Sequence, residues 1–548
     1  MRPGGPSTGY DAAVPAPADL AILNARIRTL DPGRPLARAV AVRDGQIVGV
    51  GDEAEVRGLC GTATELIDAG GDAIVPGLVD SHSHPFLGAV ETQGADLAGA
   101  ASIDDVRGRL ANERRRCGDG SWITGHSLAY SVFEGREASG ELFAEAVGGA
   151  PAVLTFFDFH TALATPAALA AAGIEGARTF GDSSEIVCRA DGRPTGELRE
   201  GAIGLVTEVM PELTGEPRLA AIAGALAAMN RVGLTGTHMM DGTLATPGEC
   251  RALEDSGRLT VRQIVPFTVE PTMDDEQIDA AIRAGADGGP LWRSGWAKFF
   301  IDGVVETGTA WLEEPDTEGR GQHPNWPDPQ RYVDVICRFA EAGFPSITHA
   351  IGDRAVRAAL DAYRAAGQVA RGPHRVEHIE TMRDSQLPRF AAEGVVASQQ
   401  AIHLQWMRSD LSDPWSRSLG PELSRRGFRL GDIRRSGAIL ALGSDWPVAG
   451  YDPRQGMAWA RLRRAPGSRD LPAYGGPGQC LTALEALEGY TTEAARAVSE
   501  GDISGRIAPG MRADLTAFAG DPVECDADDL PDLPVTLTVV AGRVVHRG

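Results

Sequence analysis

A chain of 548 residues is too long for one small domain, and a hydrophobic content of 43% is enough for a large buried core. The formal net charge of -23 argues against nucleic-acid binding and against docking on an anionic membrane, because both need a basic surface. The seven cysteines form no CxxC pair, which argues against a disulfide framework and a thiolate zinc site.

The two ends of the chain are predicted to be rich in strands. Residues 1–18 contain many Pro, Gly and Ala residues and no apolar core, so we expect a flexible tail and not a signal peptide. Residues 19–75 and 503–548 have strand-like patterns, with hairpin signals at Asp44-Gly45 and Ala541-Gly542. Because chain termini often lie close together, we expect the two segments to build one β-domain.

The middle of the chain, residues 76–502, alternates short apolar runs with segments of helical pattern. Examples of the runs are residues 233–239, 296–301, 346–350, 375–379, 395–398 and 439–443. One intervening helix is predicted to begin well, with Asp328 as N-cap and Pro329 in the first turn. This alternation is typical of repeated βα units and a parallel sheet. Residues 100–215 interrupt the rhythm and are predicted to be an insertion.

The stretch VPGLVDSHSHPF, residues 75–86, contains a candidate metal site. It leads from an apolar run into His82 and His84, which are two residues apart and would point to the same side of a strand. Neutral imidazoles are common metal ligands and suit zinc well. A bare HxH motif also occurs in ordinary surface loops, so the prediction depends on the other polar residues of the chain.

Those residues follow the apolar runs in chain order. Most of the runs carry or end in an ionisable side chain, and in parallel α/β barrels such groups gather at the carboxyl ends of the strands. Together with the HxH motif they form a set of six candidate site residues: His82, His84, Lys298, His349, His378 and Asp445.

Lys298 is the only lysine among the 52 basic Lys and Arg residues of the chain. Arginine stays protonated, whereas a buried lysine can lose its proton and act as a nucleophile. Two roles fit Lys298: a Schiff base with a carbonyl substrate, or a carbamate that bridges two metal ions. The surrounding histidines favour the carbamate.

Several motifs resemble the amidohydrolase superfamily, and more narrowly its YtcJ-like branch, which includes N-substituted formamide deformylase. They are VDSHSHP, KFFIDG, HAIGDRAV, RVEHIE, GSDWPV and the terminal GRIAPGMRADL…VVAGRVVH. The resemblance covers nearly the whole chain. It implies an α/β fold: a distorted (β/α)8 TIM-like barrel with a β-sandwich built from both chain termini.

The resemblance also implies roles for the candidate residues. His82, His84 and Asp445 would bind one Zn²⁺, His349 and His378 would bind a second, and carboxylated Lys298 would bridge them. Asp445 would act as general base and then as general acid, with Lys298 as the other catalytic residue. The residues expected to bind substrate are His160, His403, Asp302 and Gln400.

The leading hypothesis is therefore a zinc-dependent hydrolase that cleaves a C–N bond of a small amide, N-substituted formamide or cyclic amide. A metal-dependent deaminase, decarboxylase or isomerase on the same barrel is the main alternative. A Schiff-base lyase using Lys298 and a non-catalytic binding protein are further ones. No stretch approaches the roughly 18 apolar residues of a membrane span. We expect a cytoplasmic enzyme without nucleic-acid or membrane partners. A homodimer is compatible with this expectation.

Overall fold

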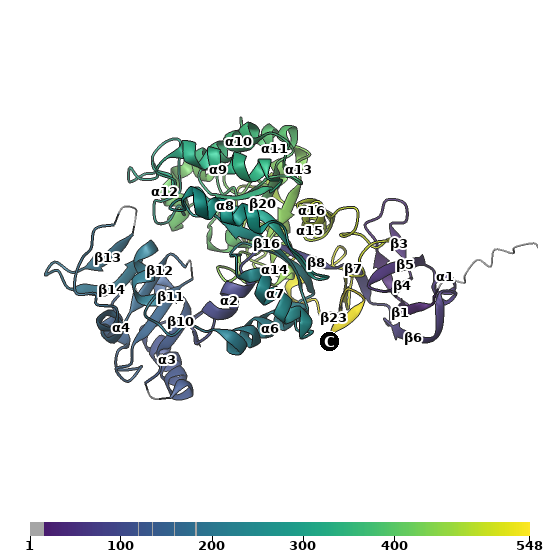
Figure 1. Ribbon diagram of the computed structural model, residues 1–548, viewed down its shortest axis with the longest axis horizontal. Helices are drawn as coiled ribbons and strands as arrows, with labels where there is room; N and C mark the ends of the chain where they lie inside the picture. The colour runs from purple at the N-terminus through teal and green to yellow at the C-terminus, as the bar shows by residue number, and fades with distance from the viewer. Residues whose placement is uncertain (1–15, 119, 134, 158, 181–183) are drawn as a thin grey trace, which may run out of the picture.

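The computed structural model describes residues 16–118, 120–133, 135–157, 159–180 and 184–548. At its centre, eight parallel strands form a sheet that curls into a nearly closed barrel (Figure 1). In chain order the strands are β8 (Leu78–Ser83), β15 (Leu234–Met239), β16 (Arg262–Thr268), β17 (Trp292–Phe300), β18 (Ser346–Ala350), β19 (Arg375–His378), β20 (Val396–Gln399) and β21 (Leu440–Leu442). Each pairs with the next, and β21 returns beside β8. The predicted α/β barrel is confirmed.

Helices cover the outside of this barrel, as α9 (Pro329–Glu341) illustrates. Asp328 caps its first turn by accepting a hydrogen bond from the backbone N–H of Gln330, and Pro329 opens the helix, as predicted. The buried side chains of α9 recur at the spacing of one helical face: Tyr332, Val335, Ile336, Phe339 and Ala340. This apolar face packs on the sheet.

Further helices between or after the barrel strands are α2 (Pro85–Glu91), α6 (Gly215–Arg231), α7 (Thr246–Asp255), α8 (Asp275–Ala284), α10 (Asp353–Ala366), α11 (Leu387–Glu393), α12 (Pro414–Ser424), α13 (Leu430–Arg435), α14 (Pro453–Leu462), α15 (Ala483–Gly489) and α16 (Thr492–Arg496). None of the helices in the described part of the chain is both long and apolar enough to cross a membrane.

Alternate side chains of a barrel strand point outward and inward. In β17, Phe299 packs outward against α9, with its ring centroid 5.8 Å from that of Tyr332 and 6.1 Å from that of Phe339. Lys298, one residue earlier, therefore points into the barrel, where it is fully buried.

Strand β16 is absent from the apolar runs named above. It contains Pro266, which has no backbone N–H and is rare inside a central strand. The register with β17 shifts between Val265 and Pro266, so the proline lies at an irregularity of the ladder. The sequence of β16 therefore does not show the pattern of a regular strand.

The strands from the two ends of the chain share sheets. A six-stranded sheet has the order β24-β23-β22-β7-β2-β3, in which β7 (Ala73–Pro76) lies between β2 (Arg26–Arg28) and β22 (Leu515–Phe518). The remaining strands of this sheet are β3 (Leu36–Ala37), β23 (Val535–Val540) and β24 (Arg543–Arg547). Both predicted hairpins form: β23 turns into β24 at residues 541–542, and β4 (Ala39–Arg43) turns into β5 (Gln46–Gly51) at residues 44–45.

A second, four-stranded sheet has the order β5-β4-β1-β6, with β1 at Ala18–Leu23 and β6 at Cys60–Asp68. Side chains of both sheets share one apolar core, which includes Ile22, Val40, Ile74, Leu515 and Val539. The predicted boundaries of this sandwich, 19–75 plus 503–548, remain a proposal that this pairing supports. Of the predicted tail, residues 1–15 lie outside the described residues.

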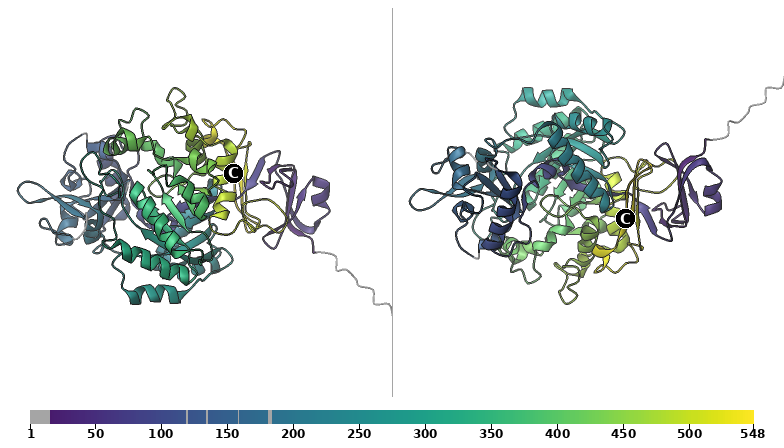
Figure 2. Two further views of the ribbon diagram at one scale, coloured as in Figure 1. Left: turned by 90° about the horizontal axis from the view of Figure 1, so that it is seen from above. Right: turned by 90° about the horizontal axis from the view of Figure 1, so that it is seen from below.

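A third sheet lies on the opposite side of the barrel from the sandwich (Figures 1 and 2). Its order is β13-β14-β12-β11-β10-β9, with strands at β9 (Ala95–Asp96), β10 (Ile123–Leu128), β11 (Ala152–Phe156), β12 (Thr161–Ala164), β13 (Glu185–Cys188) and β14 (Pro194–Arg199). The sheet has apolar cores of its own, to which the helices α3 (Ile103–Cys117) and α4 (Pro166–Ala171) contribute side chains. All strands of this sheet except β9 fall in the segment predicted as an insertion, residues 100–215.

Candidate metal centre

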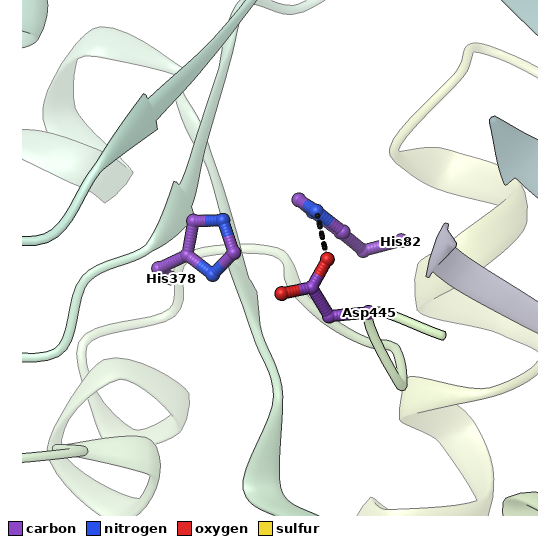
Figure 3. A group of neighbouring side chains, drawn as sticks. All are labelled: His82, His378 and Asp445. Carbon is purple, nitrogen blue, oxygen red and sulfur yellow. Dashed lines mark ion pairs between the residues drawn. The ribbon is translucent and has the colours of Figure 1, made fainter. Parts of the chain in front are cut away.

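His82, His378 and Asp445 converge at the carboxyl end of the barrel (Figure 3). Each offers one nitrogen or oxygen, and these atoms all lie within 4.8 Å of one another. His82 and His378 are on β8 and β19, and Asp445 follows β21. All three side chains are buried. The barrel therefore brings together residues that lie far apart in the sequence.

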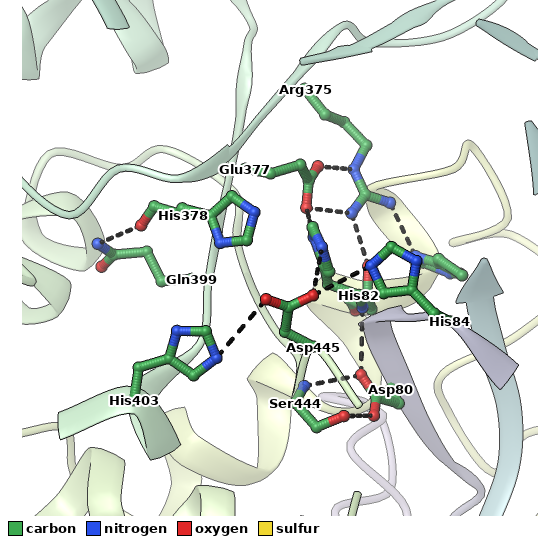
Figure 4. A network of polar contacts seen from close by, with 12 residues as sticks. Asp80, His82, His84, Arg375, Glu377, His378, Gln399, His403, Ser444 and Asp445 are labelled. Carbon is green, nitrogen blue, oxygen red and sulfur yellow. Dashed lines mark hydrogen bonds and ion pairs between the residues drawn. The ribbon is translucent and has the colours of Figure 1, made fainter. Parts of the chain in front are cut away.

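The Asp445 carboxylate lies between histidines. Its Oδ1 is 3.2 Å from Nε2 of His82 and 3.1 Å from Nε2 of His84, and its Oδ2 is 3.7 Å from Nε2 of His403 (Figure 4). Burial alone would raise the pKa of Asp445, but the nearby histidines hold it well below its ordinary value. Asp445 is therefore ionised and available as an anionic ligand.

His349 and His378 form the adjacent part of the site. Their ring centroids are 4.4 Å apart, and the His378 ring is 4.6 Å from that of His82. Burial lowers the pKa of His349 to about 3, helped by the charge of Lys298, and lowers that of His378 well below its usual range. Both imidazoles are consequently neutral, the form that binds metals.

Lys298 enters this group from β17. Burial lowers its pKa to about 8, against the opposing influence of the Glu377 and Asp445 carboxylates. Its Nζ lies 4.6 Å from the centroid of the Phe300 ring and has no hydrogen-bond partner among the described residues. A buried amine with this pKa exists partly in the neutral, nucleophilic form.

These residues fit a metal centre. Buried polar atoms normally have hydrogen-bond partners. Within the described chain, however, Nζ of Lys298 and Nδ1 of His378 are buried without any. Clustered neutral imidazoles and an ionised carboxylate are a ligand set that suits zinc. A bound cation would account for the unpaired Nδ1 of His378 and for the convergence of the three side chains.

The backbone around the site has unusual torsion angles. His378 has φ of 70° and Asp445 has φ of 63°, values in the left-handed region that non-glycine residues seldom adopt. Regular alternation would put Glu377 and His378 on opposite faces of β19, but the turn at His378 brings both into the barrel. Strain of this kind is often found where a site fixes its ligands.

Asp80, to which no role was assigned above, closes the seam of the barrel at the site. Its Oδ1 accepts hydrogen bonds from the backbone N–H of His82 at 3.1 Å and of Ser444 at 2.9 Å, and its Oδ2 accepts from the Ser444 hydroxyl. Burial raises its pKa to about 6. Gly443 makes this approach possible, because a Cβ there would lie 2.5 Å from the His82 backbone nitrogen.

Two further acidic side chains near the histidines were also not predicted. Glu377 Oε2 is 2.7 Å from Nδ1 of His82, and Asp241 Oδ1 is 3.8 Å from Nδ1 of His84. Glu377 directly precedes His378 in the sequence, but strand alternation predicts opposite faces for neighbouring residues, so no sequence signal identifies Glu377.

The residues predicted to bind substrate occupy different places. His403 lies beside Asp445, and its ring stacks at 6.3 Å from that of His378. His160 comes from the inserted sheet, contacts Glu200 at 2.9 Å, and influences the pKa of His349. The side-chain N and O of Gln400 are buried without a hydrogen-bond partner among the residues that the structure describes. These roles remain predictions.

Asp302 is tied to the backbone of neighbouring loops. Its two oxygens accept hydrogen bonds from the N–H groups of Trp311, Ile351 and Gly352 at 2.8 to 3.0 Å. Its Oδ1 is also 3.7 Å from Nε2 of His349. Burial raises the pKa of Asp302 to about 7. These contacts support a part in holding the loops around His349, and its predicted contact with substrate is untested.

The inserted sheet reaches the site through aromatic rings. Phe157 lies 5.3 Å from Trp406, and Trp406 lies 5.0 Å from His403, measured between ring centroids. Since His403 neighbours Asp445, these rings extend from the metal-centre residues to the insertion.

Comparison with known proteins also points to the amidohydrolases. The model of the amidohydrolase family matches residues 65–546. The YtcJ protein of Bacillus subtilis, named as an amidohydrolase, is 29% identical over 526 residues, which cover 93% of this chain and 96% of that protein. N-substituted formamide deformylase of Arthrobacter pascens is 27% identical over 545 residues, which cover 96% of this chain and 97% of the enzyme.

A solved structure shows the fold independently. A metal-dependent hydrolase of uncharacterized function from Pyrococcus horikoshii matches with a TM-score of 0.76 and 24% identity, covering 93% of this chain and 99% of that one. The family match extends over most of the chain and includes every residue of the centre described above. The resemblance seen in the sequence motifs is thus confirmed, and the chain belongs to the amidohydrolase family.

Proposed function

We propose that this metal-dependent hydrolase cleaves a C–N bond in a small amide, N-substituted formamide or cyclic amide. The observation that carries the proposal is the convergence of His82, His378 and Asp445, whose ligand atoms lie within 4.8 Å of one another. The relative named N-substituted formamide deformylase, which aligns over 96% of this chain, supports the choice of bond.

We assign zinc to the centre, with two ions per chain. His82, His84 and Asp445 would hold one ion, and His349 and His378 would hold the other. A carbamate on Lys298 would bridge them: the neutral amine attacks carbon dioxide, a C–N bond forms, and the amine releases a proton. The lowered pKa of Lys298, about 8, supports this step. Bound zinc would polarise the substrate carbonyl and acidify a water molecule.

Asp445 would move the proton during hydrolysis. Its pKa lies well below the ordinary value, so at neutral pH its carboxylate can accept the proton of the attacking water. The protonated Asp445 would then give this proton to the leaving nitrogen, which would depart as an amine. One side chain thus serves as base and then as acid.

The substrate would lie between Asp445 and the inserted sheet. His403, Gln400 and His160 are the proposed binding residues on the polar side. Trp406 and Phe157 are half-buried aromatic side chains that could contact an apolar substituent. We therefore expect amides with a hydrocarbon substituent to be better substrates than unsubstituted formamide.

Metal analysis combined with a substrate panel tests this proposal. The protein loaded with zinc should hydrolyse members of a panel of formamides, acylated amino acids and cyclic amides, and the protein stripped by a chelator should not. Readdition of zinc should restore turnover. Full activity in the metal-free protein would refute the proposal.

One observation favours a second candidate, a deaminase, decarboxylase or isomerase with one metal ion. Among the described residues, the compact group of His, Cys, Asp and Glu side chains that could hold an ion has three members and includes neither His84 nor His349. Elemental analysis distinguishes the two candidates, because a single-metal enzyme would contain one zinc ion per chain and an unmodified Lys298.

A further inference from the structure

Glu377 is a buried carboxylate that contacts a proposed metal ligand without belonging to the proposed ligand set. Its Oε2 lies 2.7 Å from Nδ1 of His82, and neither side chain has more than 1% exposure (Figure 4). A carboxylate has no proton to donate at this position, so the Nδ1–H of His82 donates to Glu377. In a metal-bound centre the other nitrogen, Nε2, would carry the lone pair that ligates the ion, and Nε2 lies 3.2 Å from Oδ1 of Asp445.

Arg375 holds Glu377 in turn. Its Nε donates to Oε1 of Glu377 at 2.9 Å, and its Nη2 donates to Oε2 at 3.2 Å. This two-pronged contact fixes the plane of the carboxylate. Burial would raise the pKa of Glu377, but Arg375 and His82 hold it far below its usual value, so the ionised form persists inside the barrel.

Arg375 itself is anchored on two other strands. Its Nη2 donates to the backbone oxygen of Ser81 on β8 at 2.7 Å, and its Nη1 donates to Nδ1 of His238 on β15 at 2.8 Å. Arg375 is completely buried. The guanidinium therefore connects β8, β15 and β19 directly beneath the proposed metal centre, and it has little freedom to move.

We propose that Glu377 and Arg375 are positioning residues that hold His82 in one tautomer and one orientation, with Nε2 directed at the metal. The inference rests on the proposed metal centre. Partners of this kind raise the basicity of a ligating histidine, and their loss typically costs about 10- to 100-fold in metal affinity.

Glu377→Gln tests the inference, because an amide has only one oxygen. Two oxygens now accept three hydrogen bonds, two from Arg375 and one from His82. The glutamine NH₂ would face either the guanidinium or the His82 N–H, so one of these contacts must be lost. We expect zinc affinity, measured by competition with a chromophoric chelator, to fall about 10- to 100-fold.

The visible absorption spectrum of the cobalt-loaded protein gives a second readout. It reports the ligand geometry around the ion and does not respond to a general loss of stability. Glu377→Gln should shift this spectrum relative to the wild type. An unchanged affinity together with an unchanged spectrum in the folded variant would overturn the inference.

Asp514→Asn is the matched control. Asp514 is also a buried carboxylate, and its Oδ2 pairs with Nε of Arg262 at 2.6 Å where β16 begins, at the opposite end of the barrel. This variant should lower the thermal midpoint of the metal-free protein and leave zinc affinity and the cobalt spectrum unchanged. An equal loss of affinity in the control would show a general effect of destabilisation and would also refute the inference.

A double variant covers the possibility that Glu377→Gln fails to fold because it leaves the Arg375 charge uncompensated. Arg375→Met with Glu377→Gln removes both charges at similar volume, a change that buried ion pairs often tolerate. Its affinity for zinc should be below that of the wild type, and an equal affinity would contradict the inference. If the wild type itself takes up no metal, the proposed function fails first, so the two failures are distinguishable.

Discussion

The two ends of the barrel interior differ in how their charged side chains are paired. At the carboxyl end, Lys298 and His378 carry buried atoms without hydrogen-bond partners in the described chain, and Asp445 has a left-handed backbone. At the opposite end the charged side chains are paired: Arg262 with Asp514 at 2.6 Å, and Glu500 with both Arg293 at 2.9 Å and Arg512 at 2.6 Å.

The change from the apolar layer to the layer of ionisable side chains takes only two residues along a strand. Trp296 lies two residues before Lys298 on β17, and Ile347 lies two residues before His349 on β18. Trp296 and Ile347 belong to an apolar cluster that also contains Val498. One layer of the interior thus stabilises the fold, and the layer above it holds reactive groups. This division agrees with the general location of function at the carboxyl ends of barrel strands.

The largest effect is expected from Asp445→Asn. An amide cannot accept the proton of the attacking water, so kcat should fall by roughly 10²–10⁴-fold on the best substrate of the panel. Metal content measured in parallel shows whether ligand loss contributes. A kcat equal to that of the wild type would remove Asp445 from its proposed role, and the comparison would then lose its main support at the carboxyl end.

Lys298→Arg should reduce metal occupancy. A guanidinium stays protonated and cannot form a carbamate, so the bridge between the two ions would be absent. Elemental analysis should find at least one ion lost, while the circular dichroism spectrum stays that of the wild type. Retention of full occupancy by the variant would show that Lys298 does not bridge metals.

The pH dependence of activation follows from the Lys298 pKa of about 8. Only the unprotonated amine attacks carbon dioxide, and the protonated fraction grows as the pH falls below 8. At a fixed concentration of dissolved CO₂, recovery of activity from metal-free, CO₂-free protein should slow about tenfold for each pH unit below that value.

Since Lys298 is the only lysine, ¹³C-labelled bicarbonate should produce a single lysine carbamate resonance in the NMR spectrum. The resonance should be absent from Lys298→Arg. A recovery rate that does not change with pH would contradict the proposed activation.

Ile347→Val should give the smallest effect and should be confined to stability. The variant removes one buried methyl group from the apolar cluster below the site, at an expected cost of about 0.5–1.5 kcal/mol in the free energy of unfolding. Denaturant unfolding measures this loss. We expect kcat and zinc content to remain those of the wild type, and a parallel fall in kcat would show that the two layers are coupled.

Much of the fold and of the centre could be predicted from the sequence because the signals are local. The apolar runs predict the barrel strands, and the ionisable residues that follow them predict which side chains meet. His82 and His378 are 4.6 Å apart between ring centroids although they lie on strands 1 and 6 of the barrel in chain order. β16 was not among the predicted strands because Pro266 interrupts its pattern.

The supporting contacts of the centre could not be predicted in the same way. Strand alternation places Glu377 and His378 on opposite faces, and only the positive φ of His378 brings both inward. Asp80 bonds to Ser444, from which it is separated by 364 residues, and no local pattern encodes that pairing. Such contacts depend on the closed barrel and become visible only in three dimensions.

The place of β7 in its sheet sets a condition on biosynthesis. β7 lies between β2 and β22, and β8, which follows it, meets β21 at the barrel seam. The ribosome delivers β7 and β8 early, and it delivers β22 and β21, which each complete one of their edges, near the end. Each nascent molecule must therefore keep two open strand edges from pairing with other chains until translation is nearly finished.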